Sequence, residues 1–292
     1  MILPQPNQGF FWTQEPWGAA LKSAPLLEVA QHLFTSSAVS VSRDPSDPAL
    51  AAVAVSIGLT ADAIVQVHQV HGRDVLVVRR NGDSHRSEKG AVPVSEADAL
   101  VSDDPRRALG VRVADCVPIL MADRHSGAVA AVHAGWRGTA VGAVRAAVDA
   151  MRTEFATRAR DLIVAIGPSI RSCCYEVGPE LRAAFAGAGH EAAAIDRWFA
   201  KGKRDRWQLD VVRANRDQLR AAGVAATQIH DSGLCTLCEN AAASRFDDRR
   251  IGLAASTDRP RREDDAFHSY RREGAHAGRM LAVIRGTLET GR

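Results

Sequence analysis

Runs of apolar residues separated by short breaks recur through the middle of the chain and predict a structure rich in strands. Ile64 to Val70 and Val75 to Val78 are rich in β-branched residues and are separated by a break at His71. "ALGVRVADCVPILMA" contains two more apolar runs around a break at Cys116, and "GAVAAVHAG" is another. "LIVAIG", "ATQIHDSG" and "GRMLAVIRG" complete the set of predicted strands.

Beyond Thr139 the spacing of apolar residues changes to that of a helix. "VGAVRAAVDAMRTEFATRARD" sets arginines between apolar residues and predicts an amphipathic helix. "GPELRAAFAGAG" and "QLDVVRANRDQLRAAG" predict two further helices, each ending near a glycine. Strands and helices alternate irregularly, and several strands follow one another directly. This order favours a mixed-sheet α/β domain over a doubly wound Rossmann sheet.

The start of the chain shows neither pattern. We therefore expect residues 1–32 to be an irregular N-terminal extension and residues 33–292 to form a single domain. No G-x-G-x-x-G string follows a predicted strand and no Walker loop is present, so the common nucleotide-binding motifs are absent. The most loop-like internal stretch is "SRFDDRRIGLAASTDRPRREDD".

Composition excludes several classes of protein. Of 292 residues, 46% are hydrophobic and 24% charged, which argues against disorder, and a net charge of +3 gives no electrostatic reason to expect a nucleic-acid partner. No apolar run reaches the ~18 residues of a membrane-spanning helix, and the N-terminus does not resemble a secretory signal. Five cysteines, two of them adjacent, are poor material for a disulfide framework. We therefore expect a cytoplasmic protein without a membrane partner.

Three of the breaks place a metal-competent side chain at the end of a predicted strand. These residues are His71, Cys116 and His133. Two imidazoles and a thiolate suit zinc, and three protein ligands would leave a fourth position open, as in catalytic zinc sites. A Cys–His nucleophilic pair is the other chemistry that these residues permit. Each residue taken alone could also be purely structural.

A series of strings along the chain resembles one known family. "QVHG", "ADCVPILMAD", "AAVHAGWRG", "IGPSIRSCCYEVG", "LDVVRANRDQL", "LCT" and "FHSYRREG" followed by "GRM" occur in its order, from about Ile64 to Arg285. The chain is therefore similar to the laccase-domain family, long called polyphenol oxidases and also described as zinc-dependent purine nucleoside phosphorylases. The resemblance implies a layered α/β/β/α mixed-sheet domain, shared with some cysteine-dependent toxin deamidases of the cytotoxic necrotizing factor type.

The resemblance also implies a cofactor and substrates. The family holds its metal with the residues that correspond to His71, Cys116 and His133, and zinc is the expected ion. The implied activities are phosphorolysis of adenosine, inosine, guanosine and methylthioadenosine, together with deamination of adenosine, by a monomer or small homo-oligomer. Copper-dependent phenol oxidation is the alternative, but the chain has ten histidines and no H-x-H string. A metal-binding protein with weakened catalysis is a third reading.

Further residues are candidates for the chemistry that this activity needs. Asp115 and Glu176 are candidate proton carriers, although Asp115 could instead orient a ligand histidine and Glu176 could cap a turn. For substrate binding we single out Trp136, Arg137 and Arg272, because an indole can stack on a base and a guanidinium can hold phosphate. A buried core position for Trp136, and an ion pair of Arg137 with Asp115 or Asp123, are the alternatives.

The chain departs from its relatives in several places. Leu33 to Ser42 lacks the arginine and the glycines usual there, which could weaken or retune the binding of phosphate. The charged segment 244–265 looks like a loop insertion. Cys235 is interpreted as structural or near the site and Cys238 as incidental. The adjacent Cys173 and Cys174 are expected to line the pocket without binding metal.

Overall fold

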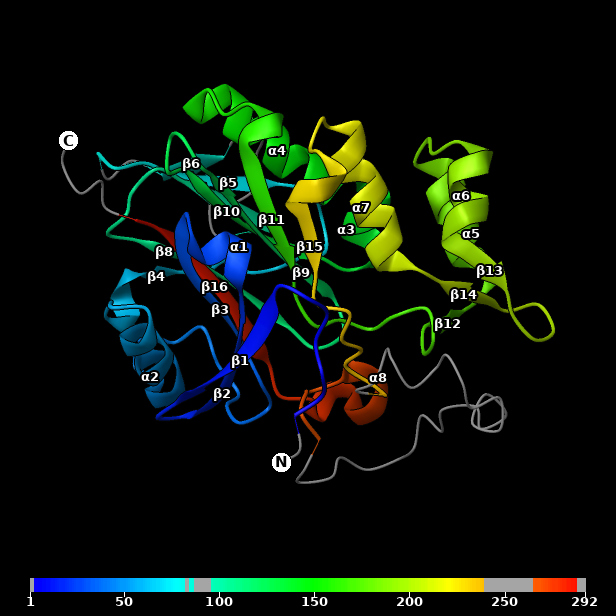
Figure 1. Ribbon diagram of the computed structural model, residues 1–292. Helices are drawn as coiled ribbons and strands as arrows, with labels where there is room; N and C mark the ends of the chain where they lie inside the picture. The colour runs from blue at the N-terminus through cyan, green and yellow to red at the C-terminus, as the bar shows by residue number, and fades with distance from the viewer. Residues whose placement is uncertain (1–2, 82–83, 87–95, 239–264, 288–292) are drawn as a thin grey trace.

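The computed structural model describes residues 3–81, 84–86, 96–238 and 265–287, and two large β-sheets pack face to face at its centre (Figure 1). In this part of the chain, the first sheet has six strands in the order β1-β2-β3-β16-β8-β4. They span Phe10–Glu15 (β1), Gly18–Ser23 (β2), Ala30–Thr35 (β3), Met280–Gly286 (β16), Ala108–Val113 (β8) and Ile64–Val65 (β4). Neighbouring strands are antiparallel except β4 and β8, which are parallel.

The second sheet has seven strands within the described ranges, in the order β15-β11-β9-β10-β7-β5-β6. They span Ile229–Asp231 (β15), Leu162–Ile166 (β11), Val117–Asp123 (β9), Val129–Ala134 (β10), Ala99–Ser102 (β7), Val75–Val78 (β5) and Ser84–Arg86 (β6). The pairs β11–β15 and β5–β7 are parallel and the others antiparallel, so the sheet is mixed. A small third sheet joins Glu176–Val177 (β12), Trp207–Leu209 (β14) and Phe199–Lys201 (β13).

The longer helices that cover the two large sheets lie on their outer sides (Figure 1). α4 and α7 cover the seven-stranded sheet, α2 covers the six-stranded sheet, and α5 and α6 lie beside the small third sheet. Their bounds are Ala24–Leu27 (α1), Pro48–Ser56 (α2), Trp136–Val141 (α3), Ala143–Phe155 (α4), Pro179–Gly187 (α5), Ala192–Trp198 (α6), Val211–Ala221 (α7) and Tyr270–Glu273 (α8). Short 3-10 turns occupy Ala61–Ala63, Ala159–Asp161, Ala226–Gln228 and Gly274–His276. Within the described ranges, no helix combines the length and the apolar character needed to cross a membrane.

Alternation along the strands divides the apolar core into three layers. In β9, Ile119 and Met121 pack with the helices, while Leu120 between them packs against the other sheet. In β16, Ala282 faces the space between the sheets and Leu281 packs with α2. Because the central strands β9 and β10 are buried on two faces, they are largely apolar rather than alternating with polar residues. The predicted α/β/β/α mixed-sheet arrangement is confirmed.

Local sequence signals explain where the main helices begin and end. Asp47 accepts a hydrogen bond from the Ala49 N–H (2.9 Å) and caps α2, and Asp210 accepts one from the Arg213 N–H (2.8 Å) and caps α7. Gly142, with φ of 84°, separates α3 from α4 in a left-handed conformation that glycine adopts readily. The helix that begins within the "HAGWRG" string therefore ends after six residues.

The strand predicted over Ile64 to Val70 is shorter in the structure. β4 ends at Val65, and the chain then leaves the sheet toward His71. The side chain of Gln69 replaces the backbone pairing, since it donates to the carbonyl of Arg112 (2.8 Å) and accepts from its N–H (2.9 Å).

The prediction of an irregular extension over residues 1–32 is wrong. β1, β2 and the beginning of β3 lie there as strands of the six-stranded sheet, with Phe10 opposite Ser23 and Glu15 opposite Gly18. The pattern was hard to see because β1 is an edge strand in which Phe10 alone is buried. The predicted loop insertion at 244–265 lies outside the described residues, apart from Asp265.

Candidate active site

The fold brings together the three residues that the sequence indicated as metal ligands. His71 lies between β4 and β5, Cys116 directly precedes β9, and His133 belongs to β10. The ligand atoms of the three side chains all lie within 4.8 Å of one another, and Cys116 Sγ is 3.9 Å from His71 Nε2. Antiparallel pairing places His133 opposite Pro118, two residues beyond Cys116. The three residues therefore converge at one end of the central strands β9 and β10 of the seven-stranded sheet.

Asp98, which the sequence analysis did not single out, connects the two histidines. Its fully buried carboxylate accepts hydrogen bonds from the N–H groups of Val70 (3.1 Å), His71 (2.9 Å) and Gly72 (2.6 Å), which are consecutive in the chain. It also lies 2.8 Å from Nδ1 of His133. Burial alone would raise the pKa of Asp98, but the hydrogen bonds from His133 and the backbone lower it.

This contact decides which nitrogen of His133 is available to a metal. A carboxylate can only accept hydrogen bonds, so Nδ1 of His133 carries the proton and Nε2 is left as the ligand atom. A carboxylate that holds a ligand histidine in this way is typical of metal sites. Asp98 therefore has the orienting role that we had considered for Asp115.

The backbone around the site adopts uncommon conformations. His71 has φ of 63° and Asp115 has φ of 84°. Left-handed conformations are unusual outside glycine and tend to occur at functional sites, where neighbouring contacts hold them. At His71 those contacts are the hydrogen bonds from three consecutive N–H groups to Asp98.

Gly135 leaves room for two of the ligands. A Cβ atom built at this position would lie 2.9 Å from Cys116 Sγ and 3.0 Å from His71 Cδ2. Both separations are shorter than ordinary contacts, so a larger residue after the strand bearing His133 would force Cys116 or His71 to shift. The first glycine of "HAGWRG" thus leaves the space that Cys116 and His71 occupy.

The electrostatics of the three groups suit a soft cation. Burial by itself would raise the pKa of the Cys116 thiol, but His133 and His71 lower it to about 6. Burial would lower the pKa of His133, while Cys116 and Asp98 raise it to about 9. One thiolate and two imidazoles, with His133 oriented by Asp98, form a donor set that fits zinc. The convergence of three groups fits a metal better than a Cys–His nucleophilic pair.

Asp115 connects segments around the site without touching a ligand histidine in the described structure. Its buried carboxylate accepts hydrogen bonds from the hydroxyl groups of Thr236 (2.6 Å) and Ser269 (3.0 Å) and from the Arg271 N–H (2.6 Å). Burial raises the pKa of Asp115 against the effect of these donors. Because these donors surround the carboxylate, the geometry gives Asp115 a positioning role.

Tyr175 lies near Cys116 and near two arginines. Burial and the Cys116 thiolate raise the pKa of Tyr175, and both Arg137 and Arg271 are close enough to oppose that rise. The Arg271 guanidinium lies 5.3 Å from the centre of the Tyr175 ring. Tyr175 belongs to the "CCYEVG" string, but no pattern in the sequence separates it from its neighbours. We missed it for that reason.

Trp136 and Arg137 form a stacked pair at the start of α3. The Arg137 guanidinium lies 4.4 Å from the Trp136 ring, and the half-buried indole packs against the core of the seven-stranded sheet. Within the described residues, Arg137 forms no ion pair with Asp115 or Asp123. The core role that we weighed for Trp136 is therefore present, while the exposed Arg137 remains available to a ligand.

The other two candidates lie in different surroundings. The Arg272 side chain is buried, with ion pairs to Asp265 (3.4 Å) and Glu273 (3.0 Å). Its neighbour Arg271 is the arginine that lies beside Tyr175. Glu176 is exposed on β12, and its backbone carbonyl accepts a hydrogen bond from Arg271 (3.1 Å). Arg272 thus connects groups inside the protein, and it could contact a substrate only if these ion pairs were broken.

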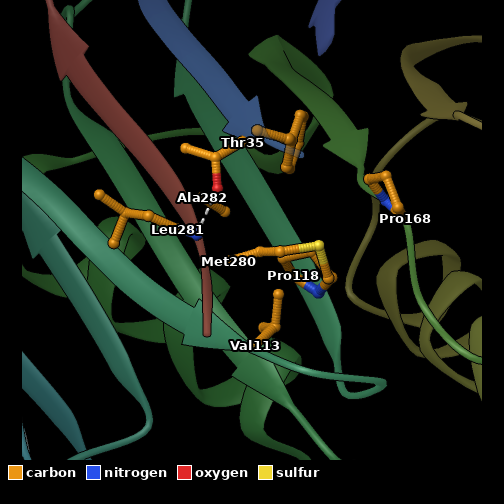
Figure 2. Close-up of a pocket in the computed structure, with 8 residues that line it drawn as sticks. Thr35, Val113, Pro118, Pro168, Met280, Leu281 and Ala282 are labelled. Carbon is orange, nitrogen blue, oxygen red and sulfur yellow. Dashed lines mark hydrogen bonds between the residues drawn. The ribbon is translucent and has the colours of Figure 1, made fainter. Parts of the chain in front are cut away.

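A small apolar hollow lies near the ends of β3, β8 and β16 (Figure 2). It encloses about 170 Å³ of empty space, part of it open to solvent. Val113, Pro118 and Met280 line it, and Thr35 contributes the one polar side chain of the lining. The Thr35 hydroxyl accepts a hydrogen bond from the Leu281 N–H (2.9 Å), and the rest of the lining is apolar (Figure 2).

The chain is similar to several known proteins. Residues 44–257 match a family model described as multi-copper polyphenol oxidoreductase laccase. The chain is 32% identical to a purine nucleoside phosphorylase of Bacteroides thetaiotaomicron, over 74% of this chain and 70% of that protein. It is 37% identical to adenosine deaminase RL5 of an unknown prokaryotic organism, over 69% of this chain and 75% of that protein. The crystal structure of YlmD from Geobacillus stearothermophilus superposes with a TM-score of 0.73 at 27% identity, covering 95% of this chain and 99% of that one.

Proposed function

We propose that this chain, which belongs to the multi-copper polyphenol oxidoreductase laccase family, is a zinc-dependent enzyme that acts on purine nucleosides. It would cleave adenosine, inosine, guanosine and methylthioadenosine with phosphate and deaminate adenosine. The observation that carries this proposal is the convergence of His71, Cys116 and His133 within 4.8 Å of one another. The names of the similar proteins, purine nucleoside phosphorylase and adenosine deaminase, support the choice of substrate.

His71, Cys116 and His133 would hold the zinc, with Asp98 fixing both histidines and Gly135 giving the ligands room. Zinc bound there would supply Lewis-acid activation, since three protein ligands leave a position open. A multi-copper centre of the oxidase type needs many more histidines than this site contains. In the described part of the chain, His71 and His133 are the two histidines that join a potential metal-ligand group.

Tyr175, Arg137 and Arg271 are the side chains that we assign to the substrate. The Tyr175 hydroxyl is protonated at neutral pH, as in any tyrosine, so it can donate a hydrogen bond while its ring contacts a base. Arg137 and Arg271 bring positive charge to the same place and can hold phosphate as a nucleophile. We prefer Arg271 to Arg272 for this role because Arg272 is engaged in internal ion pairs.

Phosphorolysis and deamination make different demands on these residues. Phosphorolysis replaces the bond between C1′ of the sugar and the base nitrogen with a bond to phosphate, and the departing base takes up a proton. Deamination replaces the amino group at C6 of adenine with an oxygen from water and releases ammonia. Asp115 is buried and accepts three hydrogen bonds inside the protein. Glu176 is exposed to solvent, so we prefer it to Asp115 as the proton carrier.

The proposal is tested by incubating zinc-loaded protein with adenosine and with inosine, with and without phosphate, and separating the products. We expect free base and ribose 1-phosphate from inosine only when phosphate is present, and inosine from adenosine without it. Cys116→Ala should abolish both activities. Asp98→Asn should lower zinc affinity about 10- to 100-fold, the usual effect of losing a group that orients a ligand histidine.

Asp103→Asn is the matched control. Asp98 directly precedes β7 and Asp103 directly follows it. The carboxylate of Asp103 accepts a hydrogen bond from the Arg80 N–H (2.9 Å) instead of from the site. The variant should retain both activities. Absence of base and of inosine with protein of confirmed zinc content would refute the proposal. Several copper ions per chain with phenol oxidation would favour the alternative.

A further inference from the structure

The four cysteines outside the candidate active site form a second group of potential metal ligands. Cys173 and Cys174 lie in the turn between β11 and β12, and Cys235 and Cys238 lie in the turn that follows β15. The sulfur atoms of all four lie within 4.8 Å of one another. Those of Cys173 and Cys238 are 3.5 Å apart. The fold therefore gathers every cysteine except Cys116 into one cluster.

Backbone pairing holds the two turns together. Ser169, which precedes the first turn, forms an isolated parallel bridge with Cys235. The Thr236 N–H donates to the Ser169 carbonyl (3.1 Å), and the Ser169 N–H donates to the Leu234 carbonyl (3.3 Å). A C-x-x-C string normally requires a second pair of ligands to form a zinc site. Here the adjacent pair Cys173-Cys174 supplies it from a neighbouring segment.

The separations fit a metal better than a disulfide. Sulfur atoms bound at about 2.3 Å around tetrahedral zinc lie about 3.8 Å apart, close to the 3.5 Å between Cys173 and Cys238. A disulfide requires about 2.0 Å, and all five cysteines of the described structure are unbridged.

Charge gives the cluster a reason to bind a cation. Four thiols gathered within 4.8 Å of one another can exchange their protons for one divalent cation, which then binds all four sulfur atoms.

We propose that Cys173, Cys174, Cys235 and Cys238 bind a second zinc ion with a structural role. Four protein thiolates complete a tetrahedron and leave no position for substrate, which distinguishes this site from that of His71. This interpretation replaces the incidental role that we had expected for Cys238 and the non-ligand role expected for Cys173 and Cys174.

The second zinc would also stabilise the active site. Tyr175 directly follows Cys174, and Thr236, which directly follows Cys235, donates a hydrogen bond to Asp115 (2.6 Å). Crosslinking the two turns would fix both residues beside Cys116. This consequence for catalysis rests on the proposed function, but the binding of the metal does not.

The test is the zinc content of the full chain, measured by mass spectrometry of protein purified under reducing conditions and equilibrated with zinc. We expect two zinc ions per chain. Cys173→Ser and Cys238→Ser, which change exposed residues and should fold, should each leave one ion. Cys116→Ala should also leave one ion, and Cys116→Ala combined with Cys173→Ser should leave none. Ser172→Ala, in the same turn, should retain both.

Cobalt substitution distinguishes the two sites directly. Cobalt held by four thiolates absorbs much more strongly in the sulfur-to-metal charge-transfer region than cobalt held by one thiolate and two imidazoles. The strong band should persist in Cys116→Ala and disappear in Cys173→Ser. Unchanged zinc content in both Cys173→Ser and Cys238→Ser would overturn the proposal. A Cys173–Cys238 disulfide in freshly purified protein that excludes zinc would also overturn it.

Discussion

At the scale of single residues, the candidate site depends on two positions whose side chains are not ligands. Asp98 fixes the proton of His133 and the backbone of His71 through one carboxylate. Gly135 provides the space in which Cys116 and His71 meet. The first could not be predicted, because an aspartate before a short apolar run is common in any sequence. The second lies within a recognisable string, but its steric reason appears only when the distances are known.

Gly135→Ala is expected to weaken zinc binding at the proposed metal site while leaving the fold intact. The new methyl group would lie 2.9 Å from Cys116 Sγ and 3.0 Å from His71 Cδ2, so at least one ligand must move. We expect the zinc affinity of this site to fall at least about 10-fold, measured by competition with a chromogenic chelator.

Gly187→Ala is the control, because a Cβ there meets no atom within 4 Å and Gly187 ends α5. It should bind zinc as the unmodified chain does. Unchanged affinity in Gly135→Ala would mean that the ligands meet elsewhere than in this geometry.

At the scale of elements, β2 and β3 show why some strands cannot be predicted from the pattern of apolar and polar residues. Their apolar residues face two different layers of the core, so no simple alternation with polar residues remains. A buried histidine connects them: the Ser23 N–H at the end of β2 donates to Nε2 of His32 in β3 (2.9 Å). Burial lowers the pKa of His32 to about 4 from its usual 6.5.

His32 makes stability depend on pH with a definite sign. Between pH 6.5 and about 4 the unfolded chain binds a proton at His32 and the folded chain does not, so stability falls as the pH falls. This group therefore lowers the free energy of unfolding by roughly 3 kcal/mol between pH 7 and pH 4. Above pH 7 it contributes no slope.

His32→Gln isolates this effect, because a glutamine oxygen can accept the Ser23 hydrogen bond but does not titrate. The difference in free energy of unfolding between the two proteins, measured with urea at a series of pH values, should change by roughly 3 kcal/mol over that range. Parallel pH curves for the two proteins would contradict the assignment of a neutral, buried His32.

At the scale of the whole molecule, Asp115 lies where the chain passes from one large sheet to the other. It lies in the turn between β8 of one sheet and β9 of the other. Its carboxylate accepts from Thr236, Ser269 and the Arg271 N–H, so it connects that turn with the segment after β15 and with α8. The same segment after β15 carries Cys235 of the second proposed zinc site.

Asp115→Asn should lower the free energy of unfolding by about 1–3 kcal/mol at pH 7, because the amide nitrogen would face a hydrogen-bond donor in a buried place. Asparagine tolerates the left-handed backbone at this position, so the change isolates the carboxylate. Thr236→Val, which removes one donor, should cost less, and urea unfolding of both variants tests this order. A stability equal to that of the unmodified chain would show that Asp115 does not act as a buried carboxylate.

The sequence by itself indicated most of the strands and helices, the mixed-sheet class and, through its resemblance to a known family, the three residues of the candidate active site. These depend on local spacing and on strings of neighbouring residues, which a sequence displays directly. The tertiary structure decided the role of Asp98, the place of Tyr175, the strands of residues 10–35 and the meeting of four cysteines. Each of these depends on which strands are neighbours and in what register, and that is set by the packing of two sheets rather than by any short stretch of chain.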